Sequence, residues 1–181
     1  WIMVWGTKIL CCYYQRNIAD NSQLPVFNIT KKWLDRYFNG EEPNISELPL
    51  SPKGGEFRKI IWDILSEIPY GKTITYGEIA EKAAKKMGKE RMSSQAVGGA
   101  VGHNPISIII PCHRVVGKNG SLTGYAGGID KKIKLLELEK VDTSHFFVPT
   151  KGTALWKYQE MRKLWKRLKY SLFFWYFAAL I

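Results

Sequence analysis

A short apolar segment closed by a proline at each end constrains the fold of this chain most strongly. Residues 105–111 read Pro-Ile-Ser-Ile-Ile-Ile-Pro. Proline fixes the backbone φ angle and has no N–H to donate, so regular structure is interrupted at both ends of the segment. The isoleucines must be buried. The segment therefore delivers the residues that follow it, Cys112 and His113, to a fixed position in the protein.

Cys112 and His113 form a candidate nucleophile and base. A free thiol has a pKa of about 8.5, so a nucleophilic cysteine needs a neighbouring base or cation. His113 can take the thiol proton directly or through a water, and Glu139 is a candidate partner that fixes the histidine tautomer. On these residues alone, a buried structural cysteine is the alternative, because cysteine is common in protein cores.

Helical spacing of apolar residues dominates the chain after residue 55. Pro69 ends the first helix, Thr75 can cap the second, and Ser93 or Ser94 can cap the third. The second and third are short helices joined by a turn, and the third is lined with small residues, so the pair resembles a helix-turn-helix. A tightly packed helix pair with no role in DNA binding is the alternative. The expected helices are 57–65, 76–84, 93–102 and 130–140.

The first fifty residues have a different pattern. Residues 1–14, rich in aromatic and β-branched side chains, predict one or two short strands. Residues 28–38 predict a helix that Thr30 caps and Gly40 ends. Residues 41–52 contain three prolines and predict an extended linker.

The charge of the chain is strongly positive and unevenly distributed. Lys and Arg number 27 against 16 Asp and Glu, for a net charge of +11. Residues 51–153 hold sixteen basic and ten acidic side chains, and residues 154–181 hold six and one. Such an excess suggests a polyanionic partner, either nucleic acid or an acidic membrane surface. The hydrophobic share of 45% excludes collagen-like and wholly disordered classes.

Three cysteines, Cys11, Cys12 and Cys112, fit a reducing compartment better than a disulfide framework, so we expect a cytoplasmic protein, located with the nucleoid DNA if the source is prokaryotic. Residues 155–169 predict a basic amphipathic helix, and residues 172–181 form an apolar run of ten. A membrane-spanning helix needs about 20. For residues 155–181 we expect a weak membrane contact or an extension without function.

Further sequence motifs lie on both sides of the central motif Pro111-Cys112-His113-Arg114-Val115. Together they resemble the O6-alkylguanine-DNA alkyltransferases, the methylated-DNA–protein-cysteine methyltransferases. The likeness covers residues 50–154 and, more weakly, residues 30–49. The motifs are residues 68–80, 96–100, 104–105, 110–115, 124–128 and 146–152.

The resemblance implies an α+β fold in two domains with an added tail. Residues 1–50 would hold a small ribonuclease H-like domain, shortened here, and the linker. Residues 51–154 would form a mostly helical domain with the helix-turn-helix and the active-site cysteine. Residues 155–181 lie beyond the family's usual end.

The resemblance also implies a single-turnover reaction. Cys112 would take an alkyl group irreversibly from O6 of guanine, or from O4-methylthymine, with no metal or organic cofactor. His113 would remove the thiol proton through a water, Glu139 would orient His113, and Asn104 would bond within this network. Tyr76 would help to extrude the nucleotide and then donate a proton to the departing guanine.

The implied partner is double-stranded DNA containing O6-alkylguanine, bound by a monomer with no stable protein partner. The helix over 93–102 would lie in the minor groove. Gln95 occupies the position where many members have an arginine finger, and Ala126 replaces a serine found in some members. The residues implied to contact DNA or the flipped base are Gln95, Ala96, Gly98, Gly99, Arg114, Val115, Gly124, Tyr125, Ala126 and Gly127.

Three other functions remain open on the sequence. One is a sensor that binds alkylguanine without transferring the group, although such relatives lack the cysteine. The second is a Cys-His hydrolase of small esters or amides, which would turn over repeatedly. The third is a peripheral membrane protein, an alternative that rests on residues 155–181 alone.

Overall fold

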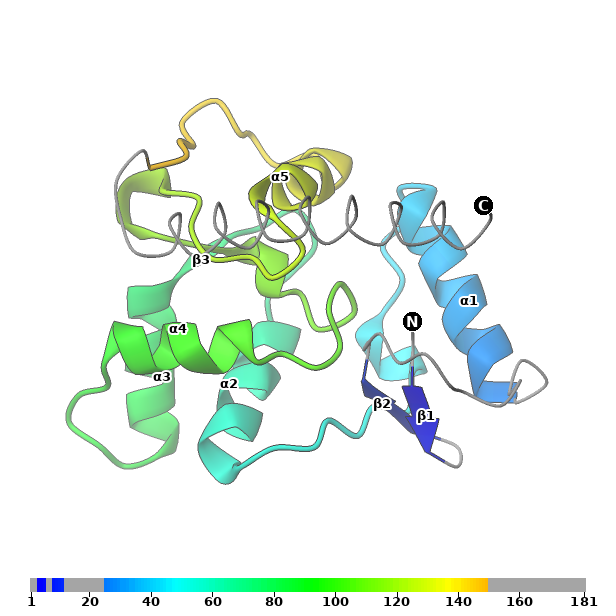
Figure 1. Cartoon of the computed structure of the whole chain (residues 1–181), viewed down its shortest axis with the longest axis horizontal. Coiled ribbons are helices and arrows are strands. Elements are labelled where there is room, and N and C mark those ends of the chain that lie inside the picture. Colours follow the sequence, from blue (N-terminus) through cyan, green and yellow to red (C-terminus); the bar gives the residue numbers. More distant parts are fainter. Residues whose placement is uncertain (1–2, 6–7, 12–24, 150–181) are drawn as a thin grey trace, which may run out of the picture.

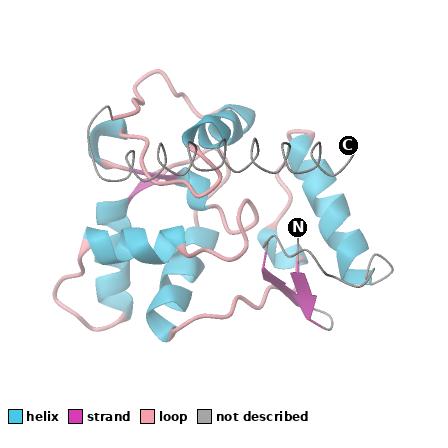
Figure 2. Ribbon diagram, in the orientation of Figure 1, coloured by secondary structure: helices cyan, strands magenta, loops and turns pink. Residues whose placement is uncertain are grey.

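The structure, a computed structural model, describes residues 3–5, 8–11 and 25–149 (Figure 1). It is a mixed fold of helices and two small two-stranded sheets (Figure 2). The helices are α1 (Pro25–Phe38), α2 (Glu56–Ser66), α3 (Tyr76–Lys86), α4 (Ser94–Gly102) and α5 (Ile129–Leu138), with 3-10 turns η1 (Ile45–Glu47), η2 (Cys112–Arg114) and η3 (Lys118–Gly120). The strands are β1 (Met3–Trp5), β2 (Lys8–Cys11), β3 (Ile74–Thr75) and β4 (Val115–Val116).

The N-terminal region begins with an antiparallel hairpin, in which β1 pairs with β2. This confirms the strands expected within residues 1–14. The ribonuclease H-like character of residues 1–50 stays a prediction, because the described part of this region consists of the hairpin, α1 and η1.

Helix α1 starts earlier than expected, at Pro25, and proline suits a first helical position because its missing N–H would be unpaired there. The expectation that Thr30 caps the helix is therefore wrong. Thr30 lies buried inside α1, and its hydroxyl donates to the Val26 carbonyl at 2.7 Å, one turn earlier. The helix ends as expected, with Gly40 in the left-handed region at φ 81°.

Helices α2, α3 and α4 pack together and bury their apolar faces in one core cluster, as the apolar spacing predicts. Thr75 caps α3 through a capping box with Glu78, and Ser93 caps α4 by accepting the N–H of Gln95 at 3.2 Å. Both caps confirm the expected helix starts. The small residues of α3 and α4 lie at the contact, where Ala83 and Ala100 are buried.

The same core extends to the N-terminal helix. Val26, Trp33 and Tyr37 of α1 belong to one cluster of buried residues with the α2 side chains Ile61 and Leu65. Figure 1 shows α1 on the opposite side of the molecule from α3, with the linker between α1 and α2. The sequence pattern did not indicate that α1 shares a core with the later helices.

Strand pairing places two distant segments side by side. β3 pairs in parallel with β4, so Ile74 lies opposite Val115. Tyr76, at the start of α3, is thereby brought toward η2, which holds Cys112. Helix α5 also packs against η2. The site is therefore assembled from α3, η2 and α5.

The expected helix and apolar end at residues 155–181 lie outside the described residues. Within the described ranges, no helix combines the length and apolarity needed to cross a bilayer.

Candidate active site

Cys112 lies at the start of η2, directly after the segment that the two prolines close. Ile106, Ile109 and Ile110 are buried as expected, but Ile108 is only half-buried. The N–H of Cys112 donates to the Ile110 carbonyl at 2.8 Å, and its side chain is buried, with 7% exposure. Ile108 has φ 76°, a left-handed conformation that β-branched residues rarely adopt. Such a conformation persists only where surrounding contacts hold it, which fits a backbone shaped to present one residue.

Asn104 is one such contact. Its side-chain oxygen accepts the Ile106 N–H at 3.0 Å, and its side-chain nitrogen donates to the Ile110 carbonyl at 2.8 Å. Asn104 thus spans the segment that precedes Cys112 and fixes the turn on which the thiol sits.

His113 and Glu139 form a fully buried pair. The Nε2 atom of His113 lies 2.8 Å from Oε1 of Glu139, and both side chains have no exposed surface. An ionised carboxylate only accepts hydrogen bonds, so Nε2 carries the proton and Nδ1 is the basic nitrogen. Nδ1 is also the only buried side-chain polar atom without a partner among the described residues. Burial lowers the pKa of His113, so its ring is neutral near pH 7 and able to accept a proton.

Glu139 follows the last residue of α5 and receives donors from four directions. Besides His113, these are the Tyr37 hydroxyl at 2.6 Å, the Gly71 N–H at 3.2 Å and the Arg114 guanidinium. Burial raises the pKa of this carboxyl, but the hydrogen bonds outweigh burial and lower the pKa to about 2. Glu139 is therefore ionised near neutral pH.

Arg114, which the resemblance implies to contact DNA or the flipped base, belongs to this network. Its Nε and one terminal nitrogen bind the two carboxylate oxygens of Glu139 at 2.8 and 2.9 Å. The other terminal nitrogen donates to the Ile68 carbonyl at 2.6 Å. These contacts hold the guanidinium against Glu139, with 11% of the side chain exposed, so Arg114 supports this carboxylate. Its expected contact with DNA or the flipped base stays a prediction.

Lys132 is a site residue that the sequence reasoning missed. It lies on the inner face of α5 with no exposed surface, and Nζ donates to the carbonyls of Val115 and Thr123. Burial lowers its pKa to about 8, and the charge of Cys112 opposes that effect. A signal was available, because Lys132 stands three residues after Ile129 and four before Leu136, on the apolar stripe of the helix.

The thiol of Cys112 is neutral at rest. Burial raises its pKa, and this effect exceeds the opposing influence of the Asn104 hydrogen bond and the Lys132 charge. Forming the thiolate therefore needs a base, and the neighbouring His113 is neutral and available.

An open pocket of about 1280 Å³ adjoins the buried network, between α3, α4 and the loop after β4. Cys112 does not line this pocket. Tyr125 does line it, and its ring packs edge-on against His113 with ring centroids 6.5 Å apart. Of the residues expected at a DNA or base site, the pocket is lined by Tyr76, Gln95, Gly98, Gly124, Tyr125 and Ala126.

Tyr76 stands between the two sides of this pocket. Its ring borders Gly98 of α4, and its hydroxyl borders Gly124 and donates to the Thr123 carbonyl at 3.4 Å. Burial raises the pKa of Tyr76, so the phenol keeps its proton at neutral pH.

The conformation of the loop at residues 124–128, which borders the Tyr76 hydroxyl, depends on one glycine. A Cβ atom on Gly127 would lie 2.7 Å from the Tyr125 ring, closer than atoms can approach. Gly127 therefore lets Tyr125 fold back as part of the pocket wall, but does not line the pocket itself.

The remaining expected residues lie at different depths. Ala96 and Gly99 are exposed on the outer surface of α4, where a Cβ on Gly99 would meet nothing within 4 Å. Val115 is fully buried, and its carbonyl accepts from Lys132 while its N–H donates to the Cys112 carbonyl.

The fold and site define a class of protein: a helical domain that holds a buried cysteine beside a neutral, carboxylate-oriented histidine, next to an open pocket. Among the described residues, no group of three or more His, Cys, Asp or Glu side chains is placed to hold a metal ion. The carboxylate of Glu139 is bound to the imidazole of His113 and to the guanidinium of Arg114.

Comparison with known proteins identifies this class. The domain described as "6-O-methylguanine DNA methyltransferase, DNA binding domain" matches residues 56–141. A methylated-DNA–protein-cysteine methyltransferase of Haemophilus influenzae is 50% identical over 119 residues, 66% of this chain and 64% of that protein. The inducible enzyme of Bacillus subtilis is 44% identical over 132 residues, 73% of this chain and 69% of that protein.

A solved structure agrees with the sequence matches. The Mycobacterium tuberculosis OGT in complex with DNA superimposes with a TM-score of 0.63 at 36% identity, covering 82% of this chain and 88% of that one. This chain belongs to the methylated-DNA–protein-cysteine methyltransferase family. It spans somewhat less than two thirds of the length of the Haemophilus influenzae relative.

Proposed function

We propose that this protein repairs DNA by transferring an alkyl group from O6 of guanine to Cys112, irreversibly and once per molecule. The observation that carries the proposal is the buried Cys112 beside the His113–Glu139 pair, next to a pocket large enough for a nucleotide. The names of the relatives support the same reaction.

The first step is proton removal from a neutral thiol. Nδ1 of His113 takes the proton of Cys112 through a bridging water, and Glu139 stabilises the resulting imidazolium. The ammonium group of Lys132 stabilises the thiolate. Since the thiol is neutral at rest, this step is coupled to arrival of the substrate.

The second step moves the alkyl group. The sulfur attacks the alkyl carbon, a carbon–sulfur bond forms, and the bond from that carbon to O6 breaks. Its electron pair passes to the guanine, which needs one proton. Tyr76 supplies this proton, and the proton held by His113 restores the balance. The product is S-alkylcysteine and unmodified guanine.

A base inside a duplex cannot reach a thiol that is 7% exposed, so the nucleotide must leave the stack. We propose that α3 and α4 act as a helix-turn-helix, with α4 in the minor groove. The small, exposed Ala96 and Gly99 permit close approach of a DNA backbone, and Gln95 at the pocket edge fills the space that the base leaves.

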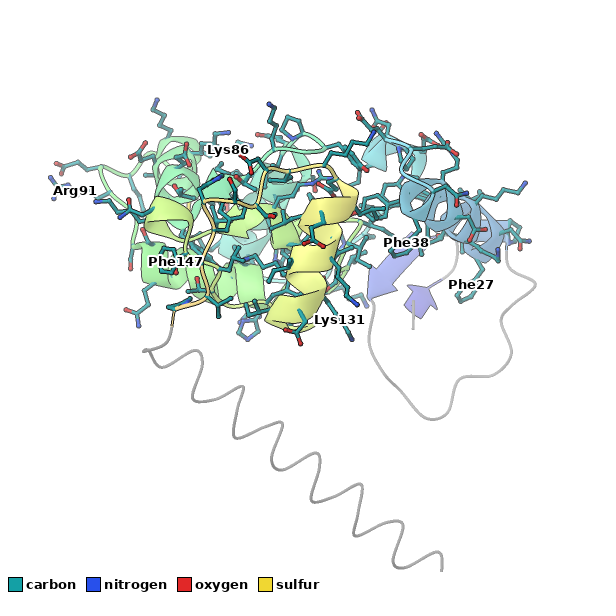
Figure 3. All side chains as sticks on the ribbon, turned by 90° about the horizontal axis from the view of Figure 1, so that it is seen from above. Phe27, Phe38, Lys86, Arg91, Lys131 and Phe147 are labelled. Carbon is teal, nitrogen blue, oxygen red and sulfur yellow. The ribbon has the colours of Figure 1, made fainter. Side chains whose placement is uncertain are left out.

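Basic side chains lie near α3 and α4. Arg91, between these two helices, lies at the end of the molecule away from Phe27 and Phe38 of α1 (Figure 3). Lys86 of α3 pairs with Glu67 at 2.7 Å. A phosphate contact by Arg91 would give affinity without sequence preference. We retain as expectations a monomeric protein and duplex DNA containing O6-alkylguanine as its partner.

The test is the intact mass of the full chain after incubation with a duplex that contains one O6-methylguanine. We expect a gain of a single methyl group on the peptide that contains Cys112. The Cys112→Ala variant should bind the duplex without gaining mass. Repeated turnover would indicate a hydrolase, and binding by the wild-type chain without any mass gain would indicate a sensor.

A further inference from the structure

Tyr37 brings the N-terminal helix α1 into direct contact with the catalytic pair. Its hydroxyl oxygen lies 2.6 Å from Oε1 of Glu139 and 3.4 Å from Nε2 of His113, and the side chain is 1% exposed. We propose that Tyr37 is a positioning residue for alkyl transfer: its hydroxyl completes the hydrogen bonding of Glu139 and sets how strongly that carboxylate acts on His113. This inference rests on the proposed function for its consequences in catalysis.

The contacts determine the direction of each hydrogen bond. Burial raises the pKa of Tyr37 well above its ordinary range, so the phenol keeps its proton. The short contact is therefore an O–H donated to Oε1 of Glu139. The same oxygen accepts the Nε2 proton of His113 at 2.8 Å. Arg114 also donates to this oxygen, at 2.9 Å. Three donors therefore share Oε1, and each weakens that oxygen as an acceptor for the others.

The contact of 3.4 Å between Tyr37 and His113 is too long to be a strong hydrogen bond. The influence of Tyr37 on the imidazole therefore passes mainly through Glu139. Removing the hydroxyl should strengthen the interaction of Glu139 with the protonated form of His113. The pKa of His113 should consequently rise.

The ring of Tyr37 is held rigidly. It stacks on Trp33 with ring centroids 5.7 Å apart and planes within 8°, and it packs edge-on against Tyr70 at 6.1 Å. The Trp33 indole N–H donates to the Asn44 carbonyl at 2.9 Å, which fixes that ring in turn. A phenylalanine would preserve this packing, so the hydroxyl can be tested separately from the ring.

Tyr70 offers a matched control. It belongs to the same aromatic cluster, but its hydroxyl donates to the Leu138 carbonyl at 3.1 Å and not to Glu139. The ionisable groups around the His113–Glu139 pair are Tyr37 of α1, Tyr70 after α2, Cys112 and Arg114 of η2, Tyr125 of the pocket loop and Lys132 of α5.

The direct test is an NMR titration of the imidazole of His113 in the full chain carrying Cys112→Ala. The chain has three histidines, so assignment is tractable. With Tyr37→Phe added, the pKa of His113 should rise by about half to one pH unit, and with Tyr70→Phe it should not move. In the chain that keeps Cys112, Tyr37→Phe should move the acid limb of the transfer rate to higher pH, lowering the rate there about fivefold.

A second replacement should shift the pKa of His113 in the opposite direction. 3,5-Difluorotyrosine at position 37 keeps the ring and hydroxyl but donates more strongly, so it should lower the pKa of His113. It also serves if Tyr37→Phe fails to fold. An unchanged titration of His113 in both variants, even with reduced thermal stability, would overturn the proposal and leave Tyr37 a packing residue. The titration needs no alkyl transfer, so this result is distinct from a failure of Cys112 to become methylated.

Discussion

Glu139→Gln tests whether the ionised carboxylate supports both the fold and the chemistry. The pKa of Glu139 falls from its ordinary 4.5 to about 2 in the folded protein. At about 1.4 kcal/mol per pH unit, the carboxylate contributes about 3 kcal/mol to folding near pH 7. Because the folded-state pKa is depressed, this contribution is present above about pH 4.5 and is lost as the pH falls toward 2. Roughly half of it should remain near pH 3.

The assay is urea unfolding followed by tryptophan fluorescence at several pH values from 7 downward. Glu139→Gln should lower the free energy of unfolding by about 3 kcal/mol at pH 7, because Arg114 loses its counter-charge and the neutral His113 loses an ionised hydrogen-bond acceptor. The difference from wild type should shrink below pH 4.5. Glu137→Gln is the matched control, since Glu137 is exposed near the end of the same helix. A difference below about 1 kcal/mol at pH 7, or one that does not change with pH, would refute the reasoning.

The same variant has a kinetic consequence. Loss of the carboxylate removes the group that orients His113 and stabilises its protonated form, so the rate of alkyl transfer should fall about 100-fold. The stoichiometry should remain one alkyl group per molecule, because the acceptor Cys112 is intact. Single-turnover kinetics with methylated duplex give the rate, and intact mass gives the stoichiometry.

Two further substitutions probe the pocket edge and the buried cation. Gln95→Arg should raise the transfer rate from duplex DNA about fivefold, which corresponds to about 1 kcal/mol in the activation free energy. The rate from a free O6-alkylguanine base should not change, because a side chain that fills the gap left by the base acts only when a base is extruded. Equal gains on both substrates would show that Gln95 has another role. Lys132→Met should slow transfer about tenfold at pH 7, because the thiolate of Cys112 loses its stabilising charge. As the pH rises through about 8 the native Lys132 itself loses its proton, so the wild-type advantage should narrow; a constant ratio across pH would exclude a charge effect.

The helices and the reactive dyad follow from the sequence because their signals are local. The capping residue Thr75, the apolar spacing after residue 55 and the adjacent Cys112 and His113 each determine structure within a few positions. The start of α1 was misplaced because Thr30, a good cap by composition, instead bonds within the helix once Pro25 begins it.

The long-range contacts of the network could not be predicted in the same way. Tyr37 and Glu139 are 102 positions apart, and nothing in the pattern of α1 distinguishes a tyrosine that donates to a carboxylate from one that fills the core. The acceptors of the Arg114 guanidinium, Glu139 and Ile68, are 25 and 46 positions away in the sequence, so they become visible only once the chain has folded. Lys132 was overlooked because buried lysines are rare.

Under the proposed function, the charges of the site explain why its thiol is neutral at rest. An acceptor that reacts once is lost to any electrophile that reaches it, and a permanent thiolate would react with many. Burial keeps both Cys112 and His113 uncharged at rest, while Glu139 and Lys132 already carry the charges that each product of proton transfer needs. The environment is thus arranged for the ion pair before the ion pair exists, which lowers the cost of forming it. In the proposed reaction, the thiol proton moves only when an extruded base occupies the pocket beside it and excludes water.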